Sequence, residues 1–100
     1  MSKSKAPDPA KYRGNPKEIA KYLNAALSTG DAVTITIAIG DMVRAQGVSR
    51  VSRRTGLRRE GLYKSFRGHV SPLFGSVIDV LLALDLQLVA KPVDTLKNSD

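Results

Sequence analysis

The stretch RRTGLRREGLYKSFRG, residues 53–68, decides the fold of this chain of 100 residues. It contains six basic residues, one acidic residue and three glycines. Ser49 is placed to cap a short helix over residues 50–55, which Gly56 can end. A second helix is predicted from Arg59 to Phe66. Because glycine adopts positive φ without steric cost, Gly56 suits a tight turn, and the pattern predicts a helix-turn-helix.

The other positions of this helix-turn-helix, residues 49–66, meet its packing requirements. Ser52 is a small residue halfway along the first helix, where the second helix must cross closely. Long polar side chains stand at the start of the second helix, where reaching the edges of DNA bases requires them. The apolar residues that would hold both helices on the core are Val51, Leu57, Leu62 and Phe66.

The net charge of +7 is concentrated on the same region. Eight basic residues and one acidic residue lie between Arg44 and Arg67, and the rest of the chain is balanced, with eight of each sign. A field concentrated in this way attracts a polyanion, and DNA or RNA is the usual one. The alternative is a solvated helix face that only promotes solubility, although such faces normally mix both signs.

The N-terminal quarter combines a loose segment with a well-marked helix. Residues 1–14 contain three lysines, two prolines and no periodic apolar pattern, so we expect a flexible N-terminal arm. In the following NPKEIAKYLNAALSTG, Asn15 suits the N-cap, with Glu18 three residues later as in a capping box. Pro16 suits the first helical position, and Gly30 can end the helix in the left-handed conformation.

The next segment, DAVTITIAIGDMVRAQG, gives conflicting local signals. Four β-branched residues alternate with small or polar ones, as in a strand: Val33, Ile35, Ile37 and Ile39. Asp31 and Gly47, however, fit the two caps of a single helix. We favour one helix of about fifteen residues, because β-propensity yields readily to tertiary context. Gly40 costs such a helix about 1 kcal/mol relative to alanine, unless close packing needs it.

Downstream of the helix-turn-helix, Ser71-Pro72 is expected to open another helix. Its buried stripe would consist of Phe74, Val77, Ile78, Leu81 and Leu84, and Met42 and both phenylalanines would lie in the core. Leu86, Leu88 and Ala90 then alternate, which indicates a short C-terminal β-strand. The domain would span residues 15–92, and residues 93–100 would form a flexible tail. Pairing of Leu86 to Val93 across a two-fold axis is our expectation for a dimer interface.

Composition speaks against several other classes of function. No run approaches the roughly 18–20 apolar residues of a membrane helix, and the N-terminus lacks the apolar run of a secretory signal, so we expect a cytoplasmic protein. The chain has no cysteine and a single histidine, His69, which follows the second helix. It also has no glycine-rich phosphate loop after a strand. We therefore expect no enzyme activity, no cofactor and no metal site.

The run GVSRVSRRTGLRREGLYKSFRG resembles the core of the addiction-module antidote proteins, the HigA-like antitoxin branch of the Xre (phage-repressor-type) helix-turn-helix family. The resemblance extends through PKEIAKYLNAALSTGD, GDMVRAQG and PLFGSVIDVLLALDLQL, and covers about residues 8–92. It implies an all-α domain of five helices that binds operator DNA as a homodimer and pairs with a small ribonuclease-type toxin. It also implies that DAVTITIAIG is helical.

Nine residues are predicted to contact DNA: Ser49, Arg50, Arg53, Arg58, Arg59, Glu60, Tyr63, Lys64 and Arg67. Arg59 and Glu60 match the base-reading positions of the family, since arginine can grip guanine and glutamate can accept from cytosine. The alternative is that these two side chains pair with each other or with Arg54. Lys64 and Arg67 are expected to bind phosphates. Tyr63 would either pack on sugars and thymine methyl groups or close the core.

Two residues depart from the family pattern. Arg58 stands where serine commonly caps the recognition helix, and arginine can bind phosphate but cannot cap. Gly61 stands where serine is usual inside that helix. It weakens the helix by roughly 1 kcal/mol relative to alanine, or it allows closer approach to the groove.

We therefore expect a repressor that binds double-stranded operator DNA, acting as the antitoxin of a toxin–antitoxin module. It would autoregulate its operon and neutralise a toxin protein. The alternatives are a prophage-type regulator without a toxin partner, a basic RNA-binding module, and a protein-interaction module in which DNA binding is vestigial.

Overall fold

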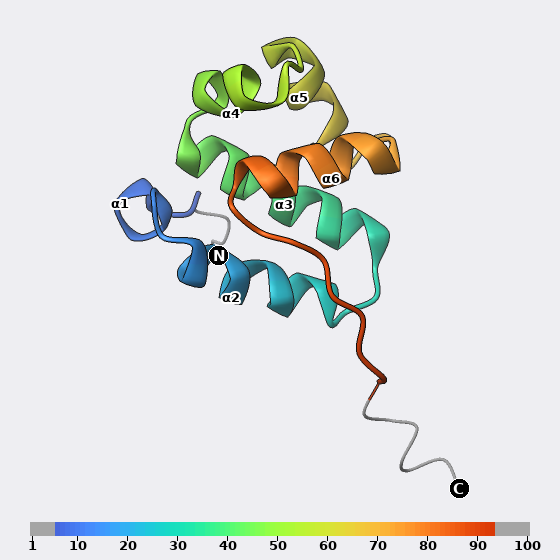
Figure 1. Cartoon of the computed structure of the whole chain (residues 1–100). Helices are drawn as coiled ribbons and strands as arrows, with labels where there is room; N and C mark the ends of the chain where they lie inside the picture. Colours follow the sequence, from blue (N-terminus) through green and yellow to red (C-terminus); the bar gives the residue numbers. More distant parts are fainter. Residues whose placement is uncertain (1–5, 94–100) are drawn as a thin grey trace, which may run out of the picture.

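The computed structural model describes residues 6–93, and these residues form six helices and no strand (Figure 1). The helices are α1 (Pro9–Tyr12), α2 (Pro16–Leu27), α3 (Ala32–Gln46), α4 (Val48–Thr55), α5 (Arg59–Ser65) and α6 (Phe74–Ala83). The prediction of an all-α fold is confirmed. The prediction of five helices followed by a C-terminal strand is wrong for these residues. None of the helices within residues 6–93 combines the length and apolar character needed to span a bilayer.

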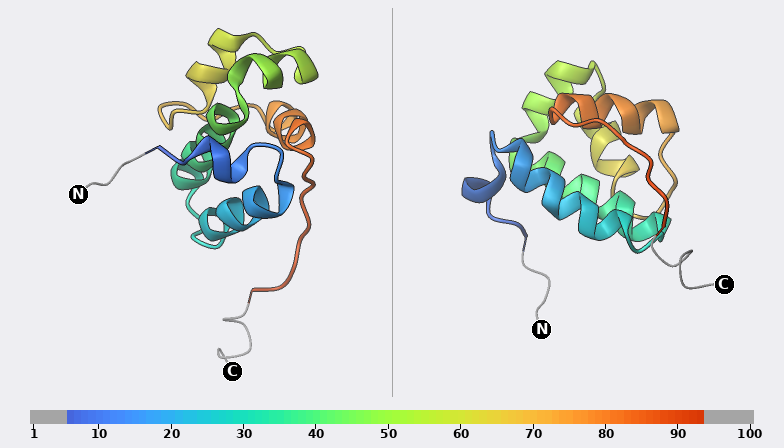
Figure 2. Two further views of the ribbon diagram at one scale, coloured as in Figure 1. Left: turned by 90° about the vertical axis from the view of Figure 1, so that its left-hand side faces the viewer. Right: turned by 60° about the horizontal axis from the view of Figure 1, so that its bottom comes forward.

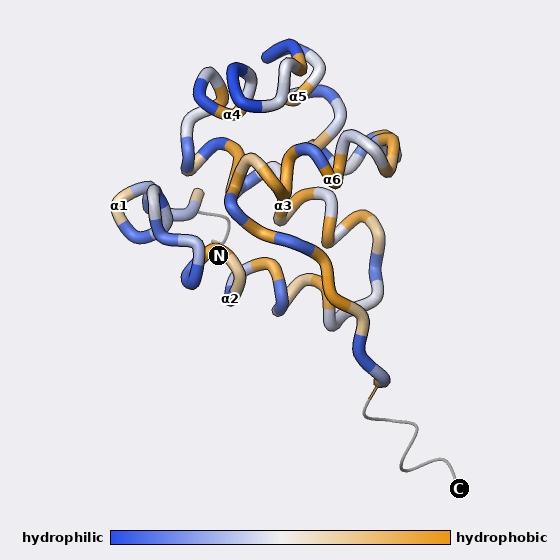
Figure 3. Tube along the Cα trace, in the orientation of Figure 1, coloured by the Kyte–Doolittle hydropathy of each residue, from blue (hydrophilic) through white to orange (hydrophobic). Residues whose placement is uncertain are grey.

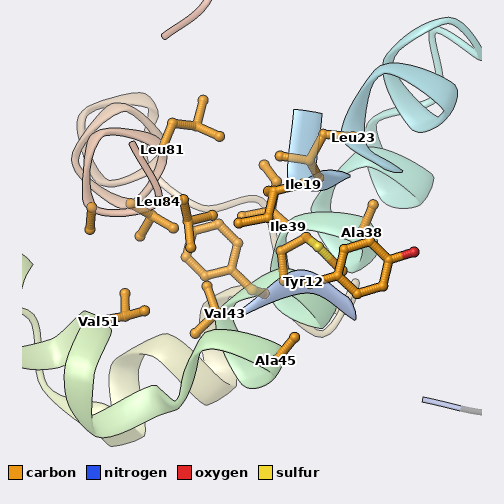
Figure 4. Close-up of a cluster of buried hydrophobic side chains, with 14 of the residues drawn as sticks. Tyr12, Ile19, Leu23, Ala38, Ile39, Val43, Ala45, Val51, Leu81 and Leu84 are labelled. Atoms are coloured by element: carbon orange, nitrogen blue, oxygen red, sulfur yellow. The ribbon is translucent and has the colours of Figure 1, made fainter. Parts of the chain in front are cut away.

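Helix α3 is the centre of the fold. It lies between α2 on one side and α4, α5 and α6 on the other (Figures 1 and 2). Side chains from α2, α3 and α6 point into one common cluster (Figure 4). Met42 and Phe66 are 0% and 2% exposed, which confirms two of the predicted core residues. Val80 of α6 is fully buried as well.

The segment with conflicting signals is a single helix, as we favoured. The Asp31 carboxylate caps α3 by accepting hydrogen bonds from the Thr34 amide, at 2.9 Å, and from the Thr34 hydroxyl, at 2.6 Å. These bonds favour the charged form and hold the pKa of the Asp31 carboxyl below its usual range. Gly47 ends the helix, and its amide donates to the carbonyls of Val43 and Arg44.

Two predicted helix starts differ from the structure, and a third start is as predicted but lacks the predicted capping hydrogen bonds. Asn15 occupies the N-cap of α2, but its side chain makes no capping bond, and Glu18 pairs with Lys21 at 3.6 Å. Helix α4 begins at Val48, with Gly47 rather than Ser49 at the N-cap. Helix α6 begins at Phe74 and not at Ser71-Pro72. A side-chain cap contributes only about 1 kcal/mol, so a helix can begin without one.

The predicted N-terminal arm of residues 1–14 is ordered in its second half. Asp8 caps α1 through the Ala10 amide, and Tyr12 is buried. The buried Gln46 side chain donates to the Tyr12 carbonyl at 3.0 Å, and the Arg13 guanidinium donates to the Ala45 carbonyl at 3.0 Å. The end of α3 therefore holds this segment, and the arm prediction is wrong for residues 8–14.

The segment after α6 is extended but is not a strand, because residues 6–93 contain no neighbouring strand that could pair with it. Asp85 adopts a left-handed conformation, with φ +65°, and the Leu86 amide donates back to the Leu81 carbonyl at 2.9 Å. The chain then runs away from α4 and α5 toward the loop joining α2 and α3 (Figures 1 and 2). Of the tail predicted at residues 93–100, all but Val93 lies outside the described residues.

Phe74 is not a core residue, contrary to the predicted stripe of α6. Its side chain is 70% exposed, and Leu73 beside it is 78% exposed. Because α6 begins two residues later than predicted, Phe74 stands at its first position, away from α3 and α4. Leu81 and Leu84 are buried and Val77 packs against the core, as predicted, whereas Ile78 is only partly buried. Val80 and Ala83 complete the buried side of the helix.

Candidate nucleic-acid interface

Helices α4 and α5 are joined by a turn of three residues, 56–58, and form one compact unit at one end of the molecule (Figure 1). Gly56 ends α4 with φ +80°, the left-handed conformation that favours glycine. The Ser52 hydroxyl donates to the Leu57 carbonyl at 2.5 Å, and the Leu57 amide donates to the Thr55 hydroxyl at 3.0 Å. Hydrogen bonds from small polar residues of α4 therefore fix the turn.

The predicted anchors hold this unit to the core. Val51 of α4 is 1% exposed, and Leu62 of α5 is 3% exposed. Phe66 follows α5 and is also buried, while Leu57 in the turn packs against the cluster. With these four residues turned inward, the other side of α5 faces solvent.

Gly40 of α3 lies directly against the end of α5. A Cβ atom built at Gly40 would stand 2.2 Å from the Phe66 carbonyl oxygen and 3.1 Å from the Phe66 Cβ. Any side chain at this position would force the backbone of Phe66 to move. Gly40 is therefore needed for close packing, and it sets the distance between α3 and the end of α5.

All nine residues predicted to contact DNA are exposed. Ser49, Arg50 and Arg53 lie on α4, Arg58 in the turn, Arg59, Glu60, Tyr63 and Lys64 on α5, and Arg67 just beyond it. Tyr63 is 42% exposed, so it does not close the core. The α4–α5 end is mainly hydrophilic, as the blue of Figure 3 shows. The structure thus brings the nine residues to one end, and their contact with DNA remains a prediction.

The basic residues of this region fall into two groups. Within residues 6–93, Arg44 pairs with Asp41 at 2.6 Å, and Arg54 pairs with Asp85 at 3.5 Å. The six others form no ion pair with any described residue: Arg50, Arg53, Arg58, Arg59, Lys64 and Arg67. The alternative, in which Glu60 would pair with Arg59 or with Arg54, is not found within residues 6–93 either. The unpaired group therefore coincides with the six basic residues predicted to contact DNA.

The pairing of Arg44 belongs to a small network behind this surface. Asp41 accepts from the Arg44 guanidinium and from the Tyr22 hydroxyl, both at 2.6 Å. Burial and the hydrogen bond to Asp41 raise the pKa of Tyr22 well above its usual range, so it stays protonated as a donor. The network joins α2 to α3 and removes Arg44 from the cations available to a ligand.

Arg54 has a structural role that the sequence does not reveal. Its guanidinium donates to the Ala83 carbonyl at 2.8 Å, at the end of α6, and contacts the Asp85 carboxylate. It therefore links α4 to a helix that begins almost twenty residues further along the chain. Neither Ala83 nor Asp85 is marked by any local pattern, so only the tertiary structure identifies them as partners.

Replacing Arg54 by alanine should lower stability by about 1 kcal/mol, because the Ala83 carbonyl loses a charged donor. For a domain of this size the midpoint of thermal unfolding should fall by about 4–8 °C. The matched control is Arg53→Ala, which removes the same charge from the neighbouring exposed side chain and should change stability by no more than about 0.5 kcal/mol. Calorimetry of both variants tests this assignment. Equal loss of stability in the two variants would contradict it.

Away from the α4–α5 unit, the described residues offer an open, mainly apolar groove of about 440 Å³ between α2 and α3. Its polar wall includes Tyr22 and Asp41, which already bond to each other. No group of three or more His, Asp or Glu residues within residues 6–93 is arranged to hold a metal ion.

Comparison with known proteins identifies the family of the chain. A family model described as "Probable addiction module antidote protein" matches residues 3–92. An uncharacterized protein of Haemophilus influenzae strain Rd is 40% identical over 80 residues, which are 80% of this chain and 82% of that relative. No solved structure matches the chain. The family model spans most of the chain, and the chain therefore belongs to the family of probable addiction module antidote proteins.

Proposed function

We propose that the chain is a sequence-specific DNA-binding repressor and the antitoxin of a toxin–antitoxin module. The observation that carries the proposal is the group of six exposed arginine and lysine side chains on the α4–α5 unit, none of them paired within the described residues. Arg44 and Arg54 are neutralised by the carboxylates of Asp41 and Asp85, whereas these six side chains have no acidic partner among the described residues. Unpaired cations of this kind are what a phosphate-binding surface requires.

In the proposed complex, phosphate contacts supply most of the affinity and α5 supplies the choice of sequence. The exposed N-terminal turn of α4, with Ser49 and Arg50, would lie against the DNA backbone, where helix amides favour an anion. Helix α5 would enter the major groove, with Arg59 directed at guanine and Glu60 at cytosine. Lys64 and Arg67 would hold the phosphates that flank the groove.

Arg58 and Gly61, the two residues that depart from the family pattern, both lie on the proposed DNA-binding side of α5. Arg58 stands at the N-cap of α5 and makes no side-chain capping bond, so its guanidinium is available to a phosphate. Gly61 is exposed, and a Cβ there would meet nothing within 4 Å. The middle of the DNA-facing side of α5 therefore lacks a side chain, which supports a closer approach of the helix to the bases.

Membership in the antidote family supports the second half of the proposal, a cognate toxin protein. We place the chain in the HigA-like branch of the Xre family, in which the partner is a small ribonuclease-type toxin and the antidote represses its own operon. The chain would act by binding, without catalysis. The folded surface outside the α4–α5 unit would carry the toxin contact.

The dependence of DNA binding on salt tests the electrostatic part of the proposal. If a dimer neutralises about six phosphates, log K should fall with log salt concentration at a slope of about −5. Fluorescence anisotropy of a labelled operator duplex at several salt concentrations measures the slope. The Arg53→Ala variant should reduce its magnitude by about 1 for each protomer, and Arg54→Ala should leave it unchanged. A slope near zero for the wild-type protein would exclude the proposed interface.

A basic RNA-binding module is the rival that the same surface permits. Tyr63 is the one exposed aromatic residue on α5, whereas readers of single-stranded RNA stack several bases on aromatic side chains. Competition between duplex DNA and structured RNA for the labelled duplex separates the two functions. Stronger competition by RNA would favour the rival. A DNA-binding protein that captures no toxin would instead be a prophage-type regulator.

A further inference from the structure

The structure brings one further arginine, Arg13, to the start of α4. Arg13 directly follows α1, in the segment that the sequence predicts to be a flexible arm, and stands far before Ser49 in the chain. Helix α1 lies beside the end of α3 (Figures 1 and 2). A Cβ atom built at Gly47, the residue between α3 and α4, would stand 4.0 Å from a terminal nitrogen of the Arg13 guanidinium. Arg13 therefore lies at the end of α4 that the proposed complex sets against the DNA backbone.

The Arg13 guanidinium is fixed at one nitrogen and free at the other two. Its Nε atom donates to the Ala45 carbonyl at 3.0 Å, in the last turn of α3, where the helix dipole favours a cation. The next residue is held as well, because the Gly14 amide donates to the Gln46 side chain at 3.4 Å. The two terminal NH2 groups form no hydrogen bond or ion pair with any described residue, and Arg13 is exposed. An arginine held in this way has two donors available that can grip a phosphate.

The surroundings of Arg13 carry the charge that attracts a polyanion. Residues 9–17 contain three basic residues and no acidic one, and none of the three forms an ion pair with a described residue. A small hollow whose lining includes Gly14, Asn15 and Arg50 joins this stretch to α4. Arg50 is one of the six unpaired cations of the α4–α5 unit. Positive charge at the start of α4 therefore comes from two segments that are far apart in the sequence.

The spacing between Arg13 and the first turn of α4 suits contacts with one strand of DNA. Ser49 is two residues after Gly47, so the Cα atoms of these two residues are no more than about 8 Å apart. The phosphates of one strand follow each other about every 3.4 Å along the helix axis. Arg13 and the first turn of α4 can therefore contact the same phosphate or neighbouring ones. Such a contact adds affinity without adding a choice of sequence.

We propose that Arg13 binds a phosphate of the DNA at or beside the phosphate that the first turn of α4 contacts. The DNA-binding surface then extends beyond the helix-turn-helix to the segment that follows α1. This inference rests on the proposed function, because it adds one contact to the same surface. The competing role for Arg13 is purely structural, in which it only caps the end of α3.

The salt dependence of binding to the labelled operator duplex separates the two roles. Arg13→Gln should reduce the magnitude of the slope of log K against log salt by about 1 for each protomer, because one phosphate contact is lost. Arg13→Lys keeps the positive charge and should keep the slope. The matched control is Lys17→Gln, which removes a charge from the exposed first turn of α2 and should leave the slope unchanged. Circular dichroism at the assay temperature establishes that each variant is folded.

Neutral methylphosphonates, placed one at a time along each strand of the duplex, locate the contact. The phosphate whose neutralisation weakens the wild type but not Arg13→Gln should coincide with, or adjoin, the phosphate found in the same way with Arg50→Gln. A coupled phosphate remote from that position would overturn the inference. Weaker binding by Arg13→Gln with an unchanged slope would also overturn it and leave Arg13 with its structural role, while the proposed function stands on the wild-type slope. A wild-type slope near zero would overturn both proposals.

Discussion

Replacing Gly40 by alanine should lower the midpoint of thermal unfolding by roughly 8 °C or more, although alanine is the better helix former. The new Cβ would stand 2.2 Å from the Phe66 carbonyl oxygen, and a backbone atom cannot move aside as a flexible side chain can. Overpacking costs about 1–3 kcal/mol, and a contact this short with a backbone atom belongs at the upper end of that range. After the gain of about 1 kcal/mol in helix propensity, a net loss of about 2 kcal/mol remains. The end of α5 should move as well, so operator binding should weaken together with stability.

The same substitution at Gly61 is the matched control. Gly61 is also a helical glycine, but a Cβ there meets nothing within 4 Å. Gly61→Ala should therefore stabilise the protein by about 1 kcal/mol through helix propensity alone. Differential scanning calorimetry of the two variants should give shifts of opposite sign. A stabilised Gly40→Ala variant would show that α3 and the end of α5 are not packed as described. Weaker DNA binding by the stabilised Gly61→Ala variant would support the close approach proposed for α5.

The double variant Arg59→Ala/Lys64→Ala should lose operator binding and keep toxin neutralisation. Arg59 is the proposed reader of guanine, and removing such a contact costs about 1–3 kcal/mol for each protomer, or about 2–6 kcal/mol for a dimer. Loss of Lys64 should weaken binding to all sequences alike, because phosphates carry no sequence information. The affinity for the operator should fall by at least roughly 30-fold, measured by anisotropy at fixed salt.

A charge-matched control separates this effect from the loss of two positive charges. Lys17→Ala/Lys21→Ala removes the same charge from α2, on the other side of α3 from the α4–α5 unit (Figure 1). It should change operator affinity only slightly. The single Arg59→Ala variant should in addition lose discrimination against operators in which the guanine is replaced. Equal weakening by both double variants would mean that net charge, and not the α5 surface, governs binding.

The sequence predicts the parts of the fold whose determinants are local. Asp31 and Gly47 mark the two ends of α3, and Gly56 marks the end of α4, because caps and left-handed positions restrict the residues that can occupy them. The anchors Val51 and Leu62 follow from helical periodicity. These local elements are enough to predict that the six cations expected to contact DNA share one end of the molecule.

What the sequence does not predict depends on contacts between distant segments. Arg54 looks like one more member of the basic run, and only the position of Ala83 makes it a structural residue. The order in residues 8–14 depends on the buried Gln46, more than thirty positions away. Apolar residues do alternate from Leu86 onward, but a strand requires a partner strand, which residues 6–93 do not provide. The exposure of Phe74 depends on where α6 begins, and the boundaries of elements are the part of a sequence pattern that is least well determined.

The separation of anchoring from exposed residues on α5 has a consequence for how such proteins diverge. Leu62 and Phe66 hold the helix in place, and Gly40 sets its depth, whereas positions 59, 60, 61, 63 and 64 are exposed. Substitutions at these five positions leave the core untouched, and at the four that are not glycine they are nearly neutral for folding. Under the proposed function, a duplicated gene could therefore change its operator through a few surface substitutions while every core contact is kept. The repressors of two such modules in one genome could then stop binding each other's operators, and every variant along the way would still fold.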